Sequence, residues 1–236
     1  MTAALPDKGR GAFTPTGKDN GSRWYEYIKG APLDGALSSK DTNYLAVNLG
    51  VKAIQDRINS YGYSPKLVSD GYLGPKTSEA IKWIQRKLHL SDDGQAGPRT
   101  CQALWRDLVA WYAGWYGCPA DQLWGMTHRE SGFDPGAVGY TTPSDRGLCQ
   151  INLVAHPSVS PSDAHDPWFA LNYTAQRFAA GRAQFSGKGF ELQRDCAIAQ
   201  HNSPVAATSW YVNGTPPNSQ IEAYVAGVLK AAELYR

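Results

Sequence analysis

The stretch Asp70–Thr77 reads DGYLGPKT, and it recurs further along the chain as DGQAGPRT at Asp93–Thr100. In each copy the Asp-Gly pair favours a tight turn with positive φ, and the second Gly gives another permissive position. The Pro that follows suits the start of a helix, where its missing N–H costs nothing. The repeat therefore predicts two turns that each lead into a helix.

Apolar residues at three- and four-residue spacing surround the first turn. Residues 80–88 carry Ala, Ile, Ile and Leu at this spacing, which predicts an amphipathic helix between the two turns. Residues 49–58 show the same pattern and predict another helix upstream. Each segment also contains an Ile-Gln pair, which ends in Gln55 in one and in Gln85 in the other.

This helical unit resembles the peptidoglycan-binding domain, a small three-helix bundle that occurs in many wall hydrolases. The resemblance covers about residues 43–106 and rests on both D-G-x-x-G-P-x-T turns and both Ile-Gln pairs. It implies that bacterial peptidoglycan is a partner of the chain. The glycines and prolines of the turns shape the backbone, so the resemblance does not identify the residues that contact the polymer.

The composition of the flanking segments sets the domain limits that we expect. Residues 1–40 are rich in Gly, Pro, Ser and Lys without sustained apolar periodicity, which favours an N-terminal arm or linker over a domain. The peptidoglycan-binding domain is predicted at 41–107. Aromatic residues are dense from Leu108 onward, and residues 108–236 are predicted to form a second domain. Because no long linker separates the two, we expect them to abut through a continuous or closely kinked helix.

Residues 120–131 have the pattern of a helix, with a proline just before them and a glycine just after them. The apolar face of this helix, which includes Leu123 and Met126, ends in Glu130. A carboxyl group at the end of an apolar stripe is expected to face the interior or a cleft. Desolvation there raises its pKa and suits it to act as a general acid. The alternative interpretation is a surface glutamate at a helix end.

Four separated motifs follow one another in the second half of the chain. They are Glu130-Ser131, the sequence GLCQI at residues 147–151, the sequence AQHN at residues 199–202, and Tyr224. This series resembles the catalytic domain of soluble lytic transglycosylases and goose-type lysozymes, in which E-S, G-L-M-Q-I, A-Y-N and a late tyrosine run in the same order. The resemblance covers about residues 108–236 and implies cleavage of a glycosidic bond in peptidoglycan.

The resemblance implies a role for each matching residue. Glu130 would be the catalytic general acid that protonates the glycosidic oxygen. Gln150, with the backbone of residues 147–148, would hold the acetamido sugar next to the scissile bond. Asn202 would bind substrate near the reacting centre, and Tyr224 would position Glu130 or donate a hydrogen bond to it.

Three positions carry further implications or departures. Ser131 is the family's companion to the acid and would contact substrate, or it would bond its own backbone at the helix end. Cys149 replaces the usual methionine of the G-L-M-Q motif, and His201 replaces the tyrosine of A-Y-N. A disulfide between Cys149 and Cys196 is one possibility, and reduced thiols in a protein made in the cytoplasm are the other.

The predicted fold is mainly α: a three-helix-bundle peptidoglycan-binding domain followed by a lysozyme-like α+β domain with a small β region near residues 136–152. Helices of the second domain are expected at about 119–131, 166–183, 191–202 and 219–235. Residues 203–218 are rich in Pro, Ser, Asn and Thr and are predicted to form a surface loop near the cleft. Trp210 and Tyr211 would stack on glycan there or pack beneath the loop.

The sequence leaves two reactions open. Most glycosidases use two carboxylates, whereas a lytic transglycosylase uses one, because the C6 hydroxyl of the sugar attacks the anomeric carbon and gives a 1,6-anhydro end. Goose-type lysozymes add acids near the G-L-M-Q segment that hold a water. Asn152, which follows that segment here, favours transfer, while Asp134 and Asp145 are candidates for positioning a water. We expect the transglycosylase reaction, with lysozyme-type hydrolysis as the alternative.

The composition argues against some classes of binding partner. A net charge of +2 argues against a nucleic-acid binder, which would carry a strongly basic stripe. The absence of about 18 consecutive apolar residues argues against membrane insertion. We expect a monomer that needs no cofactor and no metal. The N-terminus lacks a basic region followed by an apolar stretch, so we expect no cleavable signal peptide.

Two other functions and one biological setting complete the set of hypotheses. A zinc peptidase would use His156 and Asp163 with His165 or His201, although a glycine of that pattern is replaced by Val159. A non-catalytic wall-binding or virion protein is the second alternative. The two-domain organisation resembles a bacteriophage endolysin, which is made in the host cytoplasm and acts on the bacterial wall after release; a tail-associated lysin is a variant of this setting.

Overall fold

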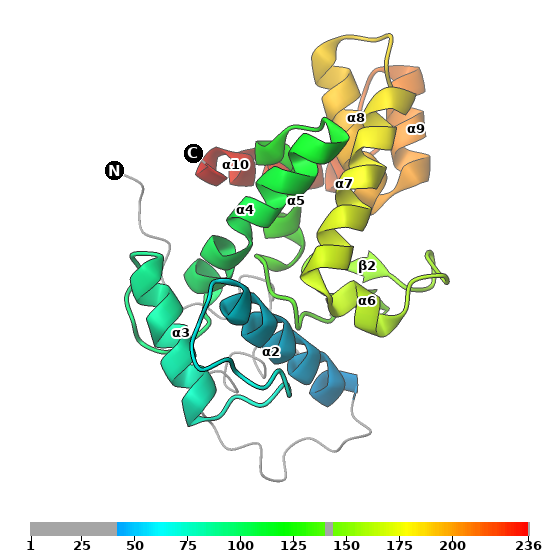
Figure 1. Cartoon of the computed structure of the whole chain (residues 1–236). Coiled ribbons are helices and arrows are strands. Elements are labelled where there is room, and N and C mark those ends of the chain that lie inside the picture. Colours follow the sequence, from blue (N-terminus) through cyan, green and yellow to red (C-terminus); the bar gives the residue numbers. More distant parts are fainter. Residues whose placement is uncertain (1–41, 140–143, 236) are drawn as a thin grey trace. The chain divides into compact units, whose positions relative to one another are not determined.

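The computed structural model describes residues 42–139 and 144–235, with side chains described from residue 48 onward (Figure 1). The elements in chain order are α2 (Thr42–Ser60), α3 (Pro75–Lys87), α4 (Pro98–Tyr116), α5 (Ala120–Ser131), β1 (Asp145–Arg146), β2 (Ile151–Asn152), α6 (Pro161–His165), α7 (Pro167–Gln184), α8 (Phe190–Asn202), α9 (Pro204–Asn213), α10 (Ser219–Ala232) and the 3₁₀ turn η1 (Glu233–Tyr235). The expected mainly α fold with a small β region is confirmed. The predicted arm at 1–40 lies outside the described residues.

The chain divides into two compact units. The first contains Met1–Trp105 and Glu130–Ala170, and the second contains Arg106–Arg129 and Leu171–Arg236. Helix α4 runs without interruption across residue 107, as expected for a chain without a linker. The first division after Trp105 lies close to the predicted boundary, but Glu130–Ala170 groups with the preceding residues. The domain limits 41–107 and 108–236 therefore stay a prediction.

The first unit begins with α2, α3 and the start of α4, which bury one apolar face each. These are the helices that the repeat and its flanking periodicity predict. Helices α2 and α3 are in contact, and the buried side chains belong to Val51, Ile54, Ile58, Ile81, Ile84 and Leu104. Each of these residues is almost fully withdrawn from water, and burial of such side chains is the main favourable term in forming the bundle.

A buried glutamine fixes the first D-G-x-x-G-P-x-T turn to α2. The side-chain Nε2 of Gln55 lies 2.9 Å from Oδ1 of Asp70, 3.0 Å from the carbonyl oxygen of Tyr72 and 3.1 Å from Oγ1 of Thr77. Its Oε1 accepts from the backbone N–H of Gly71 at 2.9 Å. The side-chain amide is thus satisfied inside the domain, as a buried polar group requires.

Gln85 binds the second turn in the same way. Its Nε2 lies 2.9 Å from Oδ1 of Asp93, 2.8 Å from the carbonyl oxygen of Gln95 and 3.0 Å from Oγ1 of Thr100. Its Oε1 accepts from the backbone N–H of Gly94 at 2.9 Å. The sequence repeat is therefore a repeat of one hydrogen-bonded frame. This frame explains why the Asp, the first Gly, the Thr and the Gln recur together.

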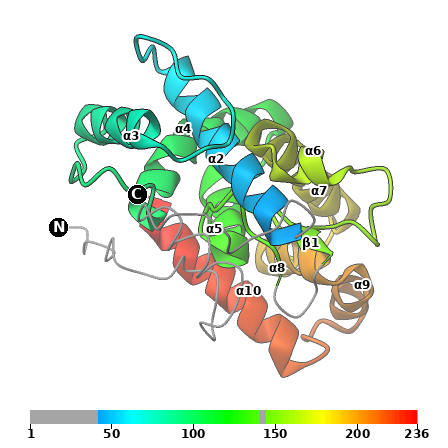
Figure 2. The same cartoon turned by 90° about the horizontal axis from the view of Figure 1, so that it is seen from below.

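The second unit contains the end of α4, most of α5 and α7, and helices α8, α9 and α10. Its buried side chains include Leu123, Met126, Phe178, Cys196 and Val228. Helix α10 packs against α8 (Figure 2). A Cβ added at Gly125 of α5 would collide with the carbonyl oxygen of Val228 in α10, so the two helices approach too closely for a larger residue.

The prediction of a surface loop at 203–218 is wrong, because residues Pro204–Asn213 form helix α9. Two of the polar residues that suggested a loop are helix caps, Ser203 of α9 and Asn218 of α10. Ser203 is the N-cap, and its side chain accepts from the backbone N–H of Ala206 at 3.3 Å. Pro occupies the first turn, and Gly214 ends the helix with φ 76°. The helices expected at 119–131, 166–183, 191–202 and 219–235 are confirmed within one or two residues at most ends.

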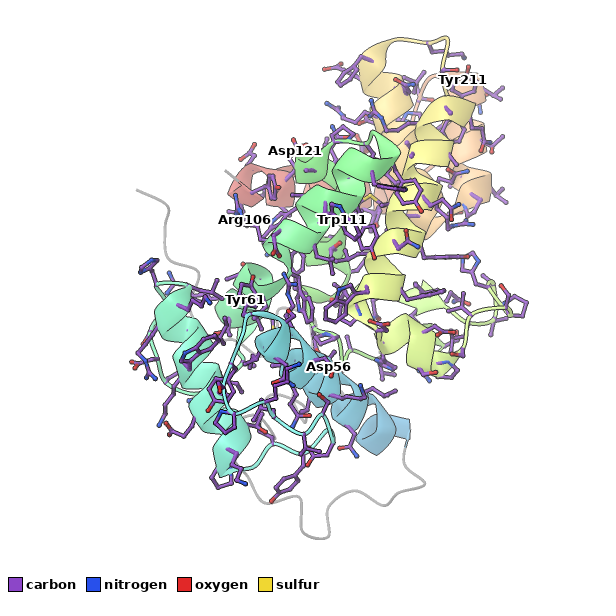
Figure 3. All side chains as sticks on the ribbon, in the orientation of Figure 1. Asp56, Tyr61, Arg106, Trp111, Asp121 and Tyr211 are labelled. Atoms are coloured by element: carbon purple, nitrogen blue, oxygen red, sulfur yellow. The ribbon has the colours of Figure 1, made fainter. Side chains whose placement is uncertain are left out.

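The two aromatic residues of α9 are held by the protein. Trp210 is buried. Tyr211, labelled in Figure 3, donates its hydroxyl to the carbonyl oxygen of Ser186 at 2.7 Å, and its ring lies 5.3 Å from that of Phe185. Packing against protein is therefore the role that the structure gives both rings.

All four cysteines are buried free thiols, so the disulfide considered between Cys149 and Cys196 is not formed. Burial raises the pKa of Cys118 and of Cys196 to about 11. Both thiols are consequently protonated and unreactive at neutral pH. Reduced cysteines were the other expectation, and the structure agrees with it. No described helix combines the length and hydropathy that crossing a membrane would take.

Candidate active site

Glu130 is the penultimate residue of α5, and its side chain is half-buried. The helix ends because the chain reverses immediately after Ser131. Gly132 and Phe133 have φ values of 60° and 77°, in the left-handed region. Phe133 is not a glycine and is fully buried, so burial of its ring offsets a backbone conformation that costs energy. This reversal directs the chain after α5 into the rest of the first unit.

Ser131 connects α5 to the G-L-C-Q segment. It is fully buried, its hydroxyl donates to the carbonyl oxygen of Leu148 at 2.7 Å, and the same hydroxyl accepts from the backbone N–H of Asp134 at 3.1 Å. The hydroxyl thus bonds the backbone both locally, at Asp134, and across the chain, at Leu148, while the substrate contact expected of Ser131 stays a prediction. The serine next to Glu130 therefore acts as a positioning residue for two backbone segments.

The G-L-C-Q segment is a tight turn pressed against α6. Gly147 has φ 70°, and a Cβ there would collide with the carbonyl oxygen of Ala164. The backbone N–H of Gly147 donates to the carbonyl oxygen of Ala137 at 2.9 Å. Leu148 and Cys149 are buried. Glycine is thus required at the start of the turn by both conformation and space.

Gln150 ends this turn with φ 48° and a half-buried side chain. Both its backbone N–H and its side-chain Nε2 donate to the carbonyl oxygen of Gly147, at 3.1 and 2.8 Å. These two bonds fix the direction of the side chain. Its amide oxygen has no hydrogen-bond partner among the described residues, and an acetamido N–H of a sugar is a suitable donor for it.

A two-stranded hairpin carries Asp145. Strands β1 and β2 are antiparallel and pair Asp145 with Asn152 and Arg146 with Ile151. The side chain of Asn152 donates to Oδ1 of Asp145 at 2.7 Å. Asp145 is half-buried, so its carboxylate is held in place but is not sealed from water. Its assignment as a water-positioning residue stays a prediction.

Asp134 lies in a very different environment from Asp145. It is fully buried, and its Oδ1 accepts from the backbone N–H of Gly136 at 2.7 Å. Its Oδ2 has no hydrogen-bond partner within the described part of the chain. Burial raises the pKa of this carboxyl group to about 7. A water positioned by Asp134 would itself have to be buried, so the geometry favours Asp145 for that role.

Two residues of the zinc-peptidase hypothesis, His165 and Asp163, form hydrogen bonds that hold the local backbone. His165 is buried, its Nδ1 lies 2.7 Å from the carbonyl oxygen of Pro135, and burial lowers its pKa to about 4. It is therefore neutral at pH 7, with Nδ1–H as the donor. Asp163 forms a capping box with Ser160 at the start of α6. No group of three or more His, Cys, Asp or Glu suited to a metal occurs among the described residues.

The remaining site candidates belong to the second unit. Asn202 is exposed at the last position of α8, and Tyr224 is buried on α10. A Cβ added at Gly227 of α10 would lie 3.0 Å from Nε of Arg129. Tyr224 lies one turn before this contact on the same helix. The substrate-binding roles of Asn202 and Tyr224 stay predictions.

Comparison with known families found a match for one segment of the chain. Residues 48–104 match the family model described as "Putative peptidoglycan binding domain". This segment of the chain is similar to a peptidoglycan-binding domain. Peptidoglycan is therefore a supported partner, and the protein is a modular, peptidoglycan-related one. Comparison with curated proteins gave no match.

Two residues that shape the first unit around Glu130 were not predicted in this role from the sequence. His165 was considered only as a metal ligand, whereas it supports the carbonyl of Pro135 from inside the protein. Ala164 was not considered, yet its carbonyl is the reason for glycine at position 147. The signal for Gly147 was present, because a glycine at the start of a short motif indicates a special conformation or a close approach. No local signal identifies the carbonyl that it approaches.

Proposed function

We propose that the protein is a muramidase that cleaves the β-1,4 bond between N-acetylmuramic acid and N-acetylglucosamine in peptidoglycan. Glu130 is the catalytic acid of this proposal. The observation that carries it is the hydrogen bond from Ser131 to Leu148, which joins the helix that bears Glu130 to the turn that bears Gln150. Two motifs that the sequence separates are thereby held together in one unit, beside a domain that binds the polymer.

The proposed reaction is that of a lytic transglycosylase. Glu130, protonated, gives its proton to the glycosidic oxygen as the C1–O bond breaks. The resulting carboxylate then removes the proton of the C6 hydroxyl, whose oxygen bonds to C1 and forms the 1,6-anhydro end. Proton and electron pairs balance with one carboxyl group and no cofactor. The full burial of Asp134, which withdraws this carboxyl group from an incoming water, supports a reaction that needs no second carboxylate.

Hydrolysis of the same bond is the second candidate function. Asp145 is half-buried and its carboxylate is held in place by the side chain of Asn152, which suits a carboxylate that orients water. In that case water would attack C1 in place of the C6 hydroxyl. The products distinguish the two reactions, because hydrolysis leaves a reducing N-acetylmuramic acid end.

Mass spectrometry of the soluble products from purified peptidoglycan tests the proposal. Anhydro-muramyl ends support the transglycosylase, and reducing ends support the hydrolase. Glu130→Gln should abolish both, by at least about a hundredfold as expected for loss of a general acid. Glu191→Gln, at an exposed position in the first turn of α8, is the matched control and should keep full activity. Intact glycan with cut stem peptides would overturn the assignment in favour of a peptidase.

We also propose the setting of a bacteriophage endolysin that is made in the host cytoplasm and reaches the bacterial wall after release. The peptidoglycan-binding domain supports this setting. Expression of the chain in a host cytoplasm should leave the culture intact until the membrane is permeabilised, and lysis should then follow within minutes. Lysis without permeabilisation would contradict the proposed route to the wall.

A further inference from the structure

The peptidoglycan-binding domain contains a groove beside the first of its two repeated turns. Its volume is about 830 Å³. The lining residues that matter here are Tyr63, Pro65, Lys66, Val68, Tyr72 and Lys76. All belong to the loop between α2 and α3 or to the start of α3. The groove is thus formed by one repeat and its preceding loop.

The two repeats share one hydrogen-bonded frame but differ in what they expose. In the first, Tyr72 is 60% exposed, and Val68 in the preceding loop is 77% exposed. In the second, Gln95 replaces the tyrosine, and the next residue, Ala96, is fully buried. Pro98 is also buried, whereas its counterpart Pro75 is exposed. The first turn therefore offers a surface for a partner, and the second turn serves the interior of the domain.

The aromatic walls of the groove are held in place before any partner binds. A Cβ added at Gly74 would lie 2.7 Å from Cε1 of Tyr72, so the ring rests directly on the glycine backbone. The ring of Tyr63 packs edge-on against Trp83, with centroids 5.3 Å apart. A preformed apolar surface loses little conformational entropy on binding.

The acidic side chains around the groove have hydrogen-bond or ion-pair partners, whereas two lysines there have none within the described part of the chain. Asp70 accepts hydrogen bonds from Gln55 and from the backbone of Tyr72, and the bond from Gln55 is the main reason that its pKa is lowered. Glu79 pairs with Lys82 at 2.8 Å. Lys66 and Lys76 are exposed, and neither has an ion-pair or hydrogen-bond partner among the described residues. The groove thus presents two open cations beside acids that are already engaged.

We propose that this groove is the wall-contacting surface of the domain and that it binds the peptide stem of peptidoglycan. Stem peptides combine alanine methyl groups with free carboxylates, whereas the glycan is uncharged apart from its substituents. The apolar walls suit the methyl groups, and Lys66 and Lys76 suit the carboxylates. The inference rests on the proposed function through the shared polymer, but it does not depend on cleavage by Glu130.

Binding to purified, insoluble peptidoglycan tests this surface without interference from cleavage. The full chain is used with Glu130→Gln, and the bound fraction is measured after pelleting. Tyr72→Ala and the double variant Lys66→Gln/Lys76→Gln should each weaken binding about tenfold, as expected for a central aromatic residue and for two ion pairs. Tyr72→Phe keeps the ring and should bind within about twofold of the parent protein. Circular dichroism establishes that each variant is folded.

The second repeat supplies matched controls at equivalent positions. Gln95→Ala corresponds to Tyr72→Ala, and Arg99→Gln corresponds to Lys76→Gln. Both should change binding by less than about twofold. Equal losses from the two repeats would overturn the proposal, because the exposed groove would then have no special part in binding.

Soluble competitors distinguish the peptide from the glycan. A stem tetrapeptide released from the wall by an amidase should displace the protein from the insoluble polymer, and a peptide-free chito-oligosaccharide should not. The reverse order of competition would overturn the assignment to the stem. Loss of cleavage in the Glu130→Gln protein leaves this result unaffected. A failure of the muramidase proposal is therefore distinguishable from a failure of the groove.

Discussion

The hydroxyl of Ser131, at the last position of α5, donates a 2.7 Å hydrogen bond to the carbonyl oxygen of Leu148. Leu148 is the second residue of the G-L-C-Q turn, and both residues are fully buried. Seventeen positions of chain separate them. A single side chain therefore fixes the end of the helix that carries Glu130 relative to the turn that carries Gln150.

Removal of this link is expected to affect stability and activity together. Ser131→Ala leaves the carbonyl of Leu148 and the backbone N–H of Asp134 without their buried partner, which should cost about 1–3 kcal/mol in the free energy of unfolding. Urea unfolding measures this loss, and wall-lytic activity should fall by more than the fraction unfolded. Ser209→Ala, on α9, removes a partly exposed hydroxyl and should change neither quantity appreciably. Equal behaviour of the two variants would contradict a special role for Ser131.

Gly147 should be far more sensitive to substitution than another glycine of the same conformation. Gly147→Ala places a Cβ against the carbonyl oxygen of Ala164 as well as imposing a left-handed backbone on alanine. We expect a loss of at least about 3 kcal/mol in unfolding free energy. Gly117 has φ 67° but open space around its Cβ position, so Gly117→Ala should cost about 1 kcal/mol. Thermal unfolding of both variants separates the steric cost from the conformational one.

Two buried groups in the first unit should give opposite dependences of stability on pH. The pKa of Asp134 is raised to about 7 in the folded protein, so its contribution is full below about pH 4 and is lost as the pH rises to 7. The pKa of His165 is lowered to about 4, so its contribution is full above about pH 6.5 and is lost as the pH falls to 4. Between pH 4 and 6.5 the two effects oppose each other.

Substitution of Asp134 or of His165 should leave only the pH dependence of stability that comes from the other residue. Relative to the parent protein, Asp134→Asn should lose stability as the pH falls from 6.5 to 4. His165→Gln should instead lose stability as the pH rises over the same range. Urea unfolding at pH 4.5, 5.5 and 6.5 measures both slopes. Parallel curves for both variants and the parent protein would show that neither group titrates as its burial implies.

Replacement of the side-chain amide nitrogen of Gln55 should lower the free energy of unfolding substantially. Gln55→Glu replaces a donor to Tyr72 and Thr77 with a carboxylate and brings that carboxylate next to Asp70. We expect a loss of about 3 kcal/mol or more, since a buried charge is left without a partner. Gln95→Glu changes a side chain that makes no hydrogen bond among the described residues and should cost less than about 0.5 kcal/mol. Comparable losses would mean that the buried frame does not hold the turn.

The helices were predictable because their signals are local. Apolar spacing identified α2 and α3, and the proline and glycine around α5 marked its ends to the residue. Helix α9 was missed because Ser203, Pro204 and Gly214 have the composition of a loop. The same residue types cap helices, so composition over a window conceals a short helix that position by position is well specified.

The sequence motifs of the candidate site could be found in advance, but the hydrogen bonds and burial that hold them in place could not. Matching motifs name Glu130 and Gln150 as candidates, whereas the bond that joins their segments depends on the fold. Asp134 and Asp145 are alike in sequence, and only burial distinguishes a carboxyl group with a raised pKa from one bonded to Asn152. Burial is a tertiary property, so no local pattern could separate them.

The proposed reaction makes a definite prediction for Asp145. If the C6 hydroxyl of the sugar is the nucleophile, Asp145→Asn removes a charge that the chemistry does not use, and activity should fall by less than about tenfold, with anhydro ends unchanged. Some loss is expected, because the bond from Asn152 to Asp145 ties the two strands of the hairpin together and an amide at position 145 accepts it less strongly. If water is the nucleophile, the same change should lower the rate by about a hundredfold or more, because it removes the base that orients the water. Product mass and initial rate on purified peptidoglycan, measured together, therefore decide whether Glu130 acts alone.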